Sequence, residues 1–182
     1  MRASQLKSLF AALRRDIRGI AAVEFALIFP LLAMLYLGGF EICRATAIYR
    51  KLADTTSEMA NITAQYTTMS ASDVSTVMNA SAQIMAPYAT QSLAVVLSEI
   101  TTDANSAATV TWSSSFNGAT PLTTGATFTL PTGMAAPSTS FILVQTSYTY
   151  TPSISSSFIS GFPMTDEIFI IPRQSPSIPY TG

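Results

Sequence analysis

One run of apolar residues near the start of the chain limits its possible folds more than any other feature. Between Ile20 and Phe40 the only charged residue is Glu24. At 1.5 Å of rise per helical residue the run reaches about 30 Å, the thickness of the hydrocarbon core of a bilayer. Pro30 would weaken a helix in water, whereas a helix embedded in a membrane tolerates it. The run therefore predicts a transmembrane helix over residues 20–40.

Positive charge is concentrated on the N-terminal side of this run. The basic residues there are Arg2, Lys7, Arg14, Arg15 and Arg18, and the only acidic one is Asp16. By the positive-inside rule this flank stays in the cytoplasm and the chain after the run is exported. Arg14, Arg15 and Arg18 are therefore predicted to be a cytoplasmic anchor. After the run only four basic residues remain, too few to track a nucleic-acid backbone.

Other targeting segments could give a chain a similar start. A cleaved secretory signal peptide has a shorter apolar core that ends in a small-residue site, and an organellar transit peptide shares the Arg- and Ser-containing start. The spanning length argues against both. Cys43 lacks the small preceding residues that lipoprotein processing needs. We interpret this single cysteine as a packing residue, with an intermolecular disulfide as the alternative.

Glu24 is the unusual residue of the run. It lies about 9 Å beyond Arg18 along the helix axis, short of the bilayer midplane. A charge at this depth costs about 2 to 3 kcal/mol on insertion scales. One explanation is that Glu24 reaches back to the interface or is protonated. The other is that a cation meets the carboxylate when the helix packs against its copies.

The residues around Glu24 also carry a family resemblance. Gly19 followed by I-A-A-V-E-F, after a short basic leader, is similar to the processing site of type IV prepilins. The longer stretch G-I-A-A-V-E-F-A-L-I-F-P-L-L resembles the TadE-like pseudopilin family of the tight-adherence (Tad/Flp) pilus machinery. Residues 109–118 and 144–174 resemble the exported region of the same family.

This resemblance implies a sequence of events. A membrane-embedded prepilin peptidase would cut between Gly19 and Ile20 and discard residues 1–19. The new α-amino group of Ile20 would be cationic below a pKa of about 8. It would pair with Glu24 of a neighbouring subunit, because an unpaired carboxylate is costly in a medium of low dielectric constant. Glu24 and the adjacent Phe25 are therefore the expected assembly residues.

The resemblance also implies location and partners. The chain would be a single-pass protein of the bacterial inner membrane, with its C-terminal domain in the periplasm. It would act as a minor pilin-like structural subunit in pilus biogenesis, at the priming or tip of the pilus or in surface adherence. The expected partners are the prepilin peptidase, other Tad pilins and pseudopilins, and the inner membrane.

Residues 41–68 continue a helical pattern after the apolar run. Residues at alternating spacings of three and four form one stripe: Ile42, Ala45, Tyr49, Leu52, Thr56, Met59, Thr63 and Tyr66. We expect this stripe to pack on the protein's own domain, although a coiled coil between copies stays open. Ser70 or Ser72 resembles a helix cap, with Asp73 in the first turn, and predicts a second, shorter helix that Pro87 ends.

The remaining chain has the pattern of β-strands. Five stretches rich in β-branched and aromatic residues cover 92–101, 107–115, 125–130, 140–151 and 166–172. The sequence thus predicts an α+β fold: a long N-terminal transmembrane helix that continues into a periplasmic helix, a second short helix and a small antiparallel β-sheet. The expected divisions are a leader (1–19), a span (20–40), a helical extension (41–68) and an exported domain (70–182). We expect four or five strands, covered by the shorter helix.

The sequence offers little for catalysis. It contains no histidine and one cysteine, which excludes a Ser-His-Asp triad, a histidine-bearing metal site and a thiolate cluster. Asp166 and Glu167 are neighbours on a strand, so they would point to opposite faces. We therefore expect no enzyme activity, cofactor, metal or small-molecule substrate, and an exported hydrolase is the least favoured reading.

The remaining alternative belongs to another functional class. The chain could be a signal-anchored periplasmic binding protein or adhesin, whose helix only tethers a ligand-binding sheet. Trp112, Tyr148 and Tyr150 could then form a platform for a glycan. Aromatic residues on alternating strands are, however, more often core residues or cross-strand pairs.

Overall fold

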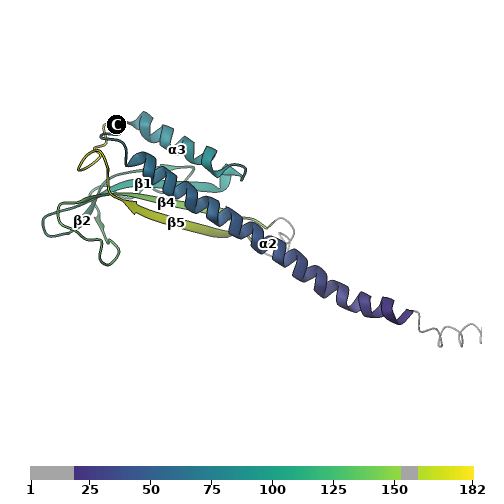
Figure 1. Cartoon of the computed structure of the whole chain (residues 1–182). Helices are drawn as coiled ribbons and strands as arrows, with labels where there is room; N and C mark the ends of the chain where they lie inside the picture. Colours follow the sequence, from purple (N-terminus) through teal and green to yellow (C-terminus); the bar gives the residue numbers. More distant parts are fainter. Residues whose placement is uncertain (1–18, 153–159) are drawn as a thin grey trace, which may run out of the picture. The chain divides into compact units, whose positions relative to one another are not determined.

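The computed structural model describes residues 19–152 and 160–182 (Figure 1). The chain divides into two compact units, which meet between Cys43 and Arg44. One helix contributes to both units, and the other elements belong to the second. The elements are α2 (Ile20–Thr63), α3 (Ala71–Met85), the short 3-10 helix η2 (Thr90–Ser92), β1 (Leu93–Thr102), β2 (Ala108–Phe116), β3 (Thr127–Phe128), β4 (Ser140–Tyr150) and β5 (Phe162–Ile170).

The first part of α2 carries the apolar run. The helix begins at Ile20, immediately after Gly19, and continues through Pro30. Among the described residues it is the one helix long and apolar enough to cross a membrane, and its most apolar window has no buried residue within the protein. Large apolar side chains such as Phe25, Leu27 and Leu35 are exposed. The predicted candidate membrane anchor is therefore confirmed in length, composition and exposure.

The second unit is built on a five-stranded antiparallel sheet with the strand order β3-β2-β1-β4-β5. The predicted α+β fold is confirmed. β5 begins earlier than the expected residue 166, because β4 pairs with it along its whole length, as far as Tyr150 opposite Phe162. β5 is an outer strand of the sheet and carries Pro163, Asp166 and Glu167.

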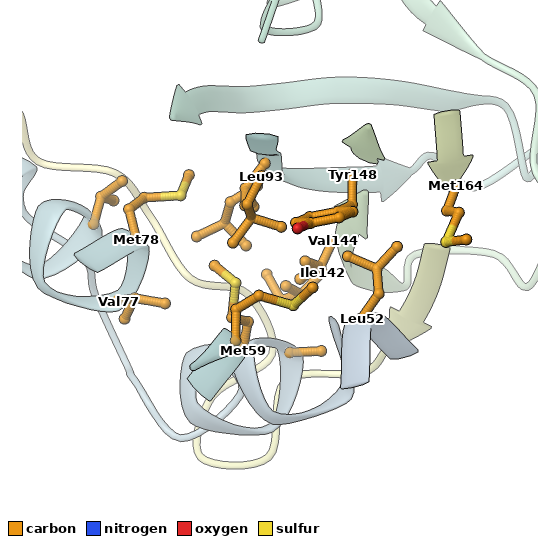
Figure 2. Packing of buried hydrophobic residues seen from close by; sticks show 14 of the residues in the cluster. Leu52, Met59, Val77, Met78, Leu93, Ile142, Val144, Tyr148 and Met164 are labelled. Carbon is orange, nitrogen blue, oxygen red and sulfur yellow. The ribbon is translucent and has the colours of Figure 1, made fainter. Parts of the chain in front are cut away.

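Two helices pack on one face of this sheet (Figure 1). The shared core contains Leu52 and Met59 from α2, Val77 from α3, and Leu93 and Val144 from the strands (Figure 2). The shorter helix covers the sheet, as the sequence predicts. The C-terminal half of α2 covers it too, because its side chains are part of the same core.

The buried face of α2 differs in part from the predicted stripe. Its buried residues are Ile48, Leu52, Thr55, Thr56, Met59, Ala60 and Thr63. Four of these belong to the predicted set, whereas Ile42 and Tyr49 are exposed. The hydroxyl of the buried Thr56 has hydrogen-bond partners: it lies 2.7 Å from that of Thr146 on β4 and also donates to the carbonyl of Leu52. The prediction that this stretch packs on its own domain is confirmed.

α3 starts where the sequence predicts. Ser70 is its N-cap: the Ser70 hydroxyl accepts a hydrogen bond from the backbone N–H of Asp73, and the Asp73 carboxylate accepts one from the backbone N–H of Ser70. This reciprocal capping box satisfies two N–H groups that a helix start leaves unpaired. The helix ends at Met85, two residues before Pro87.

The last residues of the chain close one end of the core. We call residues 171–182 the C-terminal segment. Its Ile178 is fully buried and joins the core between the helices and the sheet. The indole N–H of Trp112 donates to the carbonyl of Ile178 at 2.8 Å, and the Trp112 ring stacks on Tyr180. Tyr180 also forms a parallel bridge with Met69, between the two helices. The segment is therefore part of the fold of the second unit.

Candidate functional site

The candidate processing site lies at the start of α2. Gly19 precedes the helix and Ile20 is its first residue, with about half of the Ile20 side chain exposed. A Cβ atom added to Gly19 would meet nothing within 4 Å among the described residues. The fold therefore does not require glycine at this position. If glycine is required here, the requirement comes from another molecule that acts on this part of the chain and not from the fold.

The candidate assembly residues lie in the next turn of the same helix. Glu24 is exposed and follows Ile20 by four residues, so both lie on one side of α2. The ring of Phe25 is 60% exposed and its centroid lies 5.5 Å from that of Phe29, one turn further on. The structure thus presents one carboxylate on an otherwise apolar helical surface. Such a surface can bury itself in lipid or against other apolar helices.

The other predicted residues fall into two groups. Arg14, Arg15 and Arg18 lie outside the described residues. Trp112, Tyr148 and Tyr150 are all buried in the core, so they form no exposed aromatic platform.

The second unit shows no assembled catalytic pair in its described part. Asp166 lies opposite Thr146 and Glu167 opposite Gln145, so the two carboxylates occupy opposite faces of β5. The side-chain amide of Gln145 donates to Glu167 at 3.2 Å. No group of three or more metal-ligating side chains occurs among the residues that the structure describes.

Two of the depressions on the second unit have polar residues in their lining. One, of about 590 Å³, is lined by residues of β1, β4 and β5 together with Ala119. The other, of about 390 Å³, contains Arg44, Tyr88 and Tyr148. Sequence reasoning did not single out Arg44 as a residue of a pocket. The available signal was its place as the first basic residue after the apolar run.

Sequence reasoning also missed Glu99. This residue is fully buried in β1, where its Oε1 atom accepts hydrogen bonds from the Ser140 hydroxyl at 2.6 Å and from the backbone N–H of Ile178 at 2.7 Å. The signal in the sequence was a glutamate inside an apolar strand. Its contacts tie β1 to β4 and to the C-terminal segment, which indicates a structural role.

Comparison with known proteins gives one match. Residues 19–61 match the family model described as TadE-like protein. No curated protein and no solved structure matches the chain. The matched segment begins at Gly19, includes Glu24 and ends two residues before the end of α2. The resemblance seen in the sequence is thereby confirmed over residues 19–61: this segment is similar to TadE-like proteins.

Proposed function

We propose that this chain is a pseudopilin, a minor pilin-like structural subunit of a Tad pilus assembly and secretion system. It is inserted in the bacterial inner membrane with its leader in the cytoplasm and its second unit in the periplasm. A prepilin peptidase cuts between Gly19 and Ile20. The released helix then packs against other Tad pilins and pseudopilins during priming of the pilus or at its tip. The role is structural rather than catalytic.

The observation that supports this proposal most is the position of Glu24. It is the only charged residue between Ile20 and Phe40, the exposed apolar part of α2, it stands one turn after the first helical residue, and it lies inside the segment that matches the TadE-like model. A carboxylate on such a surface is costly in lipid unless a cation neutralises it. The α-amino group that cutting would create at Ile20 supplies that cation.

The pairing would also fix how subunits align. If the amine of one subunit meets Glu24 of its neighbour, helices shifted along their axes would leave both charges in an apolar interior. Separating a buried pair in this way costs about 3 to 5 kcal/mol. The wrong registers are then excluded by their cost. Pairing of Glu24 with the amine of its own chain would neutralise the charge without setting a register.

Replacing the carboxylate tests the assembly role. Glu24→Gln keeps the shape of the side chain and removes the charge, so membrane insertion should be unchanged or improved. Incorporation into pili, or pilus formation itself, should fall at least tenfold. Glu58→Gln, which makes the same change at an exposed position further along α2, is the matched control. Normal pili built with Glu24→Gln would contradict the assembly role.

Replacing Gly19 tests the cut. Gly19→Leu should leave α2 intact, because a Cβ atom there meets nothing within 4 Å among the described residues. The peptidase, however, should no longer accept the bond. N-terminal sequencing of protein from the native membrane should then give Met1 for the variant and Ile20 for the unmodified chain. A start at Met1 in both would argue against processing.

A signal-anchored periplasmic binding protein or adhesin is the second candidate. The 590 Å³ depression favours it, because polar side chains such as Gln145, Thr165 and Glu167 line it. In this case the helix would only tether the second unit, and Glu24→Gln would leave function unchanged.

A hydrolase screen of the purified full chain tests the non-catalytic role. Turnover that a single substitution in this depression abolishes would overturn it.

A further inference from the structure

A pocket of about 390 Å³ lies in the second unit, where α2, the turn after α3 and strand β4 meet. It is lined by Arg44, Ile48, Pro87, Tyr88, Ala89, Ser92, Tyr148, Thr149, Tyr150 and Thr151. The residues come from three separate parts of the chain. Three of them, Ile48, Tyr148 and Tyr150, belong to the buried core, in which Figure 2 shows Tyr148. The pocket is therefore held by the packing of the unit rather than by a single loop.

The charge of this pocket favours an anion. Arg44 is the only ionised side chain among its described lining residues, and none of them is acidic. The nearest carboxylate in the sequence, Glu41, stands one helical turn earlier and does not line the pocket. Tyr88, Ser92 and Tyr148 also line the pocket, and their hydroxyl groups are further hydrogen-bond donors.

Tyr148 is well suited to act as one of these donors. Burial raises the pKa of its hydroxyl above the usual 10, while the positive charge of Arg44 and a hydrogen bond with the backbone of Ala89 act in the opposite direction. The hydroxyl therefore keeps its proton at neutral pH. Arg44 and Tyr148 line the same pocket, so one ligand there can meet both.

The place of Arg44 in the chain indicates where the anion comes from. Arg44 follows the last residue of the apolar run, Phe40, by four residues of the same helix, which is about 6 Å of rise. If the run spans the bilayer, this distance brings the guanidinium to the level of the lipid headgroups. A planar guanidinium can hold two oxygens of a phosphate at once, which an ammonium group cannot.

We propose that this pocket binds the phosphodiester of an anionic phospholipid headgroup. The Arg44 guanidinium holds two phosphate oxygens, and the hydroxyls of Tyr88 and Tyr148 donate to the phosphate or to the glycerol beyond it. The site would fix the second unit against the membrane surface. The inference rests on the candidate membrane span but not on the pilus role, so it holds for a tethered binding protein as well.

The test uses the full chain, labelled with ¹⁵N-arginine, in maltoside micelles. The probes are dihexanoyl phosphatidylglycerol, dihexanoyl phosphatidylcholine, glycerol 3-phosphate and inorganic phosphate, and the readout is the Nε–H resonance of Arg44. We expect saturable binding of phosphatidylglycerol, at least tenfold tighter than that of the other three. Arg44→Gln, labelled with ¹⁵N-alanine and followed through the backbone amide of Ala89, should weaken this binding at least tenfold, and Tyr148→Phe severalfold.

Arg50→Gln is the matched control, because it removes the same charge from an exposed position of the same helix that does not line the pocket. It should keep the affinity within twofold. Equal losses in Arg44→Gln and Arg50→Gln would mean nonspecific attraction and overturn the proposal. Phosphate binding as tightly as phosphatidylglycerol would identify a site for a free anion, and phosphatidylcholine binding as tightly would remove the preference for anionic lipid. Either result would also overturn the proposal.

Discussion

Glu99 shows how much a single buried residue can hold together. One oxygen of its carboxyl group accepts two hydrogen bonds, from the Ser140 hydroxyl and the Ile178 backbone, while Oε2 is buried with no partner among the described residues. An unpaired buried oxygen is costly. The two bonds to Oε1 must therefore matter enough to offset this cost.

Truncating Glu99 should destabilise the second unit strongly. Glu99→Ala leaves the buried N–H of Ile178 and the hydroxyl of Ser140 unpaired and opens a cavity, so we expect a loss of about 3 kcal/mol. Glu99→Gln keeps an acceptor oxygen and should cost less. Ser140→Ala removes one of the two bonds and should cost about 1 kcal/mol. Urea unfolding followed by Trp112 fluorescence measures all three, and equal values for Glu99→Ala and Ser140→Ala would contradict this account.

At the residue scale, the sequence predicted local contacts well and distant ones poorly. Ser70 and Asp73 are three residues apart, so their capping signal is visible in the sequence and is confirmed. Glu99 meets Ser140 and Ile178, which are 41 and 79 residues away. Nothing in the pattern around Glu99 indicates these partners, because they meet only once the sheet and the C-terminal segment have formed.

Among the elements, α3 depends most on its first turn. The Ser70 side chain and its backbone N–H both hydrogen-bond the Asp73 carboxylate, and these bonds lower the pKa of Asp73 below its ordinary value. A group whose pKa is lower in the folded state stabilises the fold above its unfolded pKa of about 3.9 and loses that contribution as the pH falls through its folded pKa.

Two substitutions separate the parts of this cap. Ser70→Ala should destabilise the second unit by about 1 kcal/mol at neutral pH, because it removes the acceptor for a first-turn N–H group. Asp73→Asn should remove the part of the acid dependence that this carboxylate causes, so its stability should fall less between pH 5 and pH 2. Thermal unfolding across this range measures both. The same acid dependence in Asp73→Asn and the unmodified chain would show that other carboxylates dominate.

The helices and strands were predicted in number and type, but their exact faces and bounds were not. Alternating polarity identifies β4 clearly, whereas the early start of β5 at Phe162 depends on pairing with Tyr150. Along α2 the alternating spacing of three and four residues identified the buried side of the helix to within one turn. This spacing predicted that Tyr49 is buried and left out Ile48. The packing of α2 against β4 and α3 decides which of these two adjacent apolar residues is covered.

For the molecule as a whole, the C-terminal segment completes the second unit. The backbone of Met69 donates to Pro179 at 3.0 Å and accepts from Thr181 at 2.9 Å, and Ile178 fills the core between them and Glu99. Removing residues 175–182 should therefore lower the free energy of unfolding by about 5 kcal/mol. This is the sum of the lost Ile178 side chain and the backbone N–H and C=O of Met69, which are left unpaired. We expect the midpoint of thermal unfolding to fall by about 10 to 20 °C.

A graded variant makes this prediction sharper. Ile178→Ala removes the buried side chain but keeps the backbone partners of Glu99 and Trp112, so it should cost about 2 to 4 kcal/mol, less than the deletion. Trp112 is the only tryptophan and touches the segment directly, which makes its fluorescence a local probe. A deletion that unfolds at the same temperature as the unmodified chain would show that the segment is dispensable.

The proposed orientation can be tested with the single cysteine. Cys43 is exposed and lies three residues after the apolar run. If the second unit is periplasmic, a membrane-impermeant maleimide should label Cys43 in intact spheroplasts. A variant that combines Cys43→Ser and Ser4→Cys with Gly19→Leu, which should keep the leader on the chain, should react only after lysis. Labelling of Cys43 only after lysis would place the second unit in the cytoplasm.

The outer strand β5 affects whether neighbouring copies of the chain can pair through their sheets. An open strand invites backbone pairing with another molecule, but β5 carries Pro163, which lacks a donor, and the adjacent acids Asp166 and Glu167. Two β5 strands with these residues repel one another instead of pairing edge to edge. Copies held close together, as the proposed membrane location would hold them, are therefore not expected to join through β5.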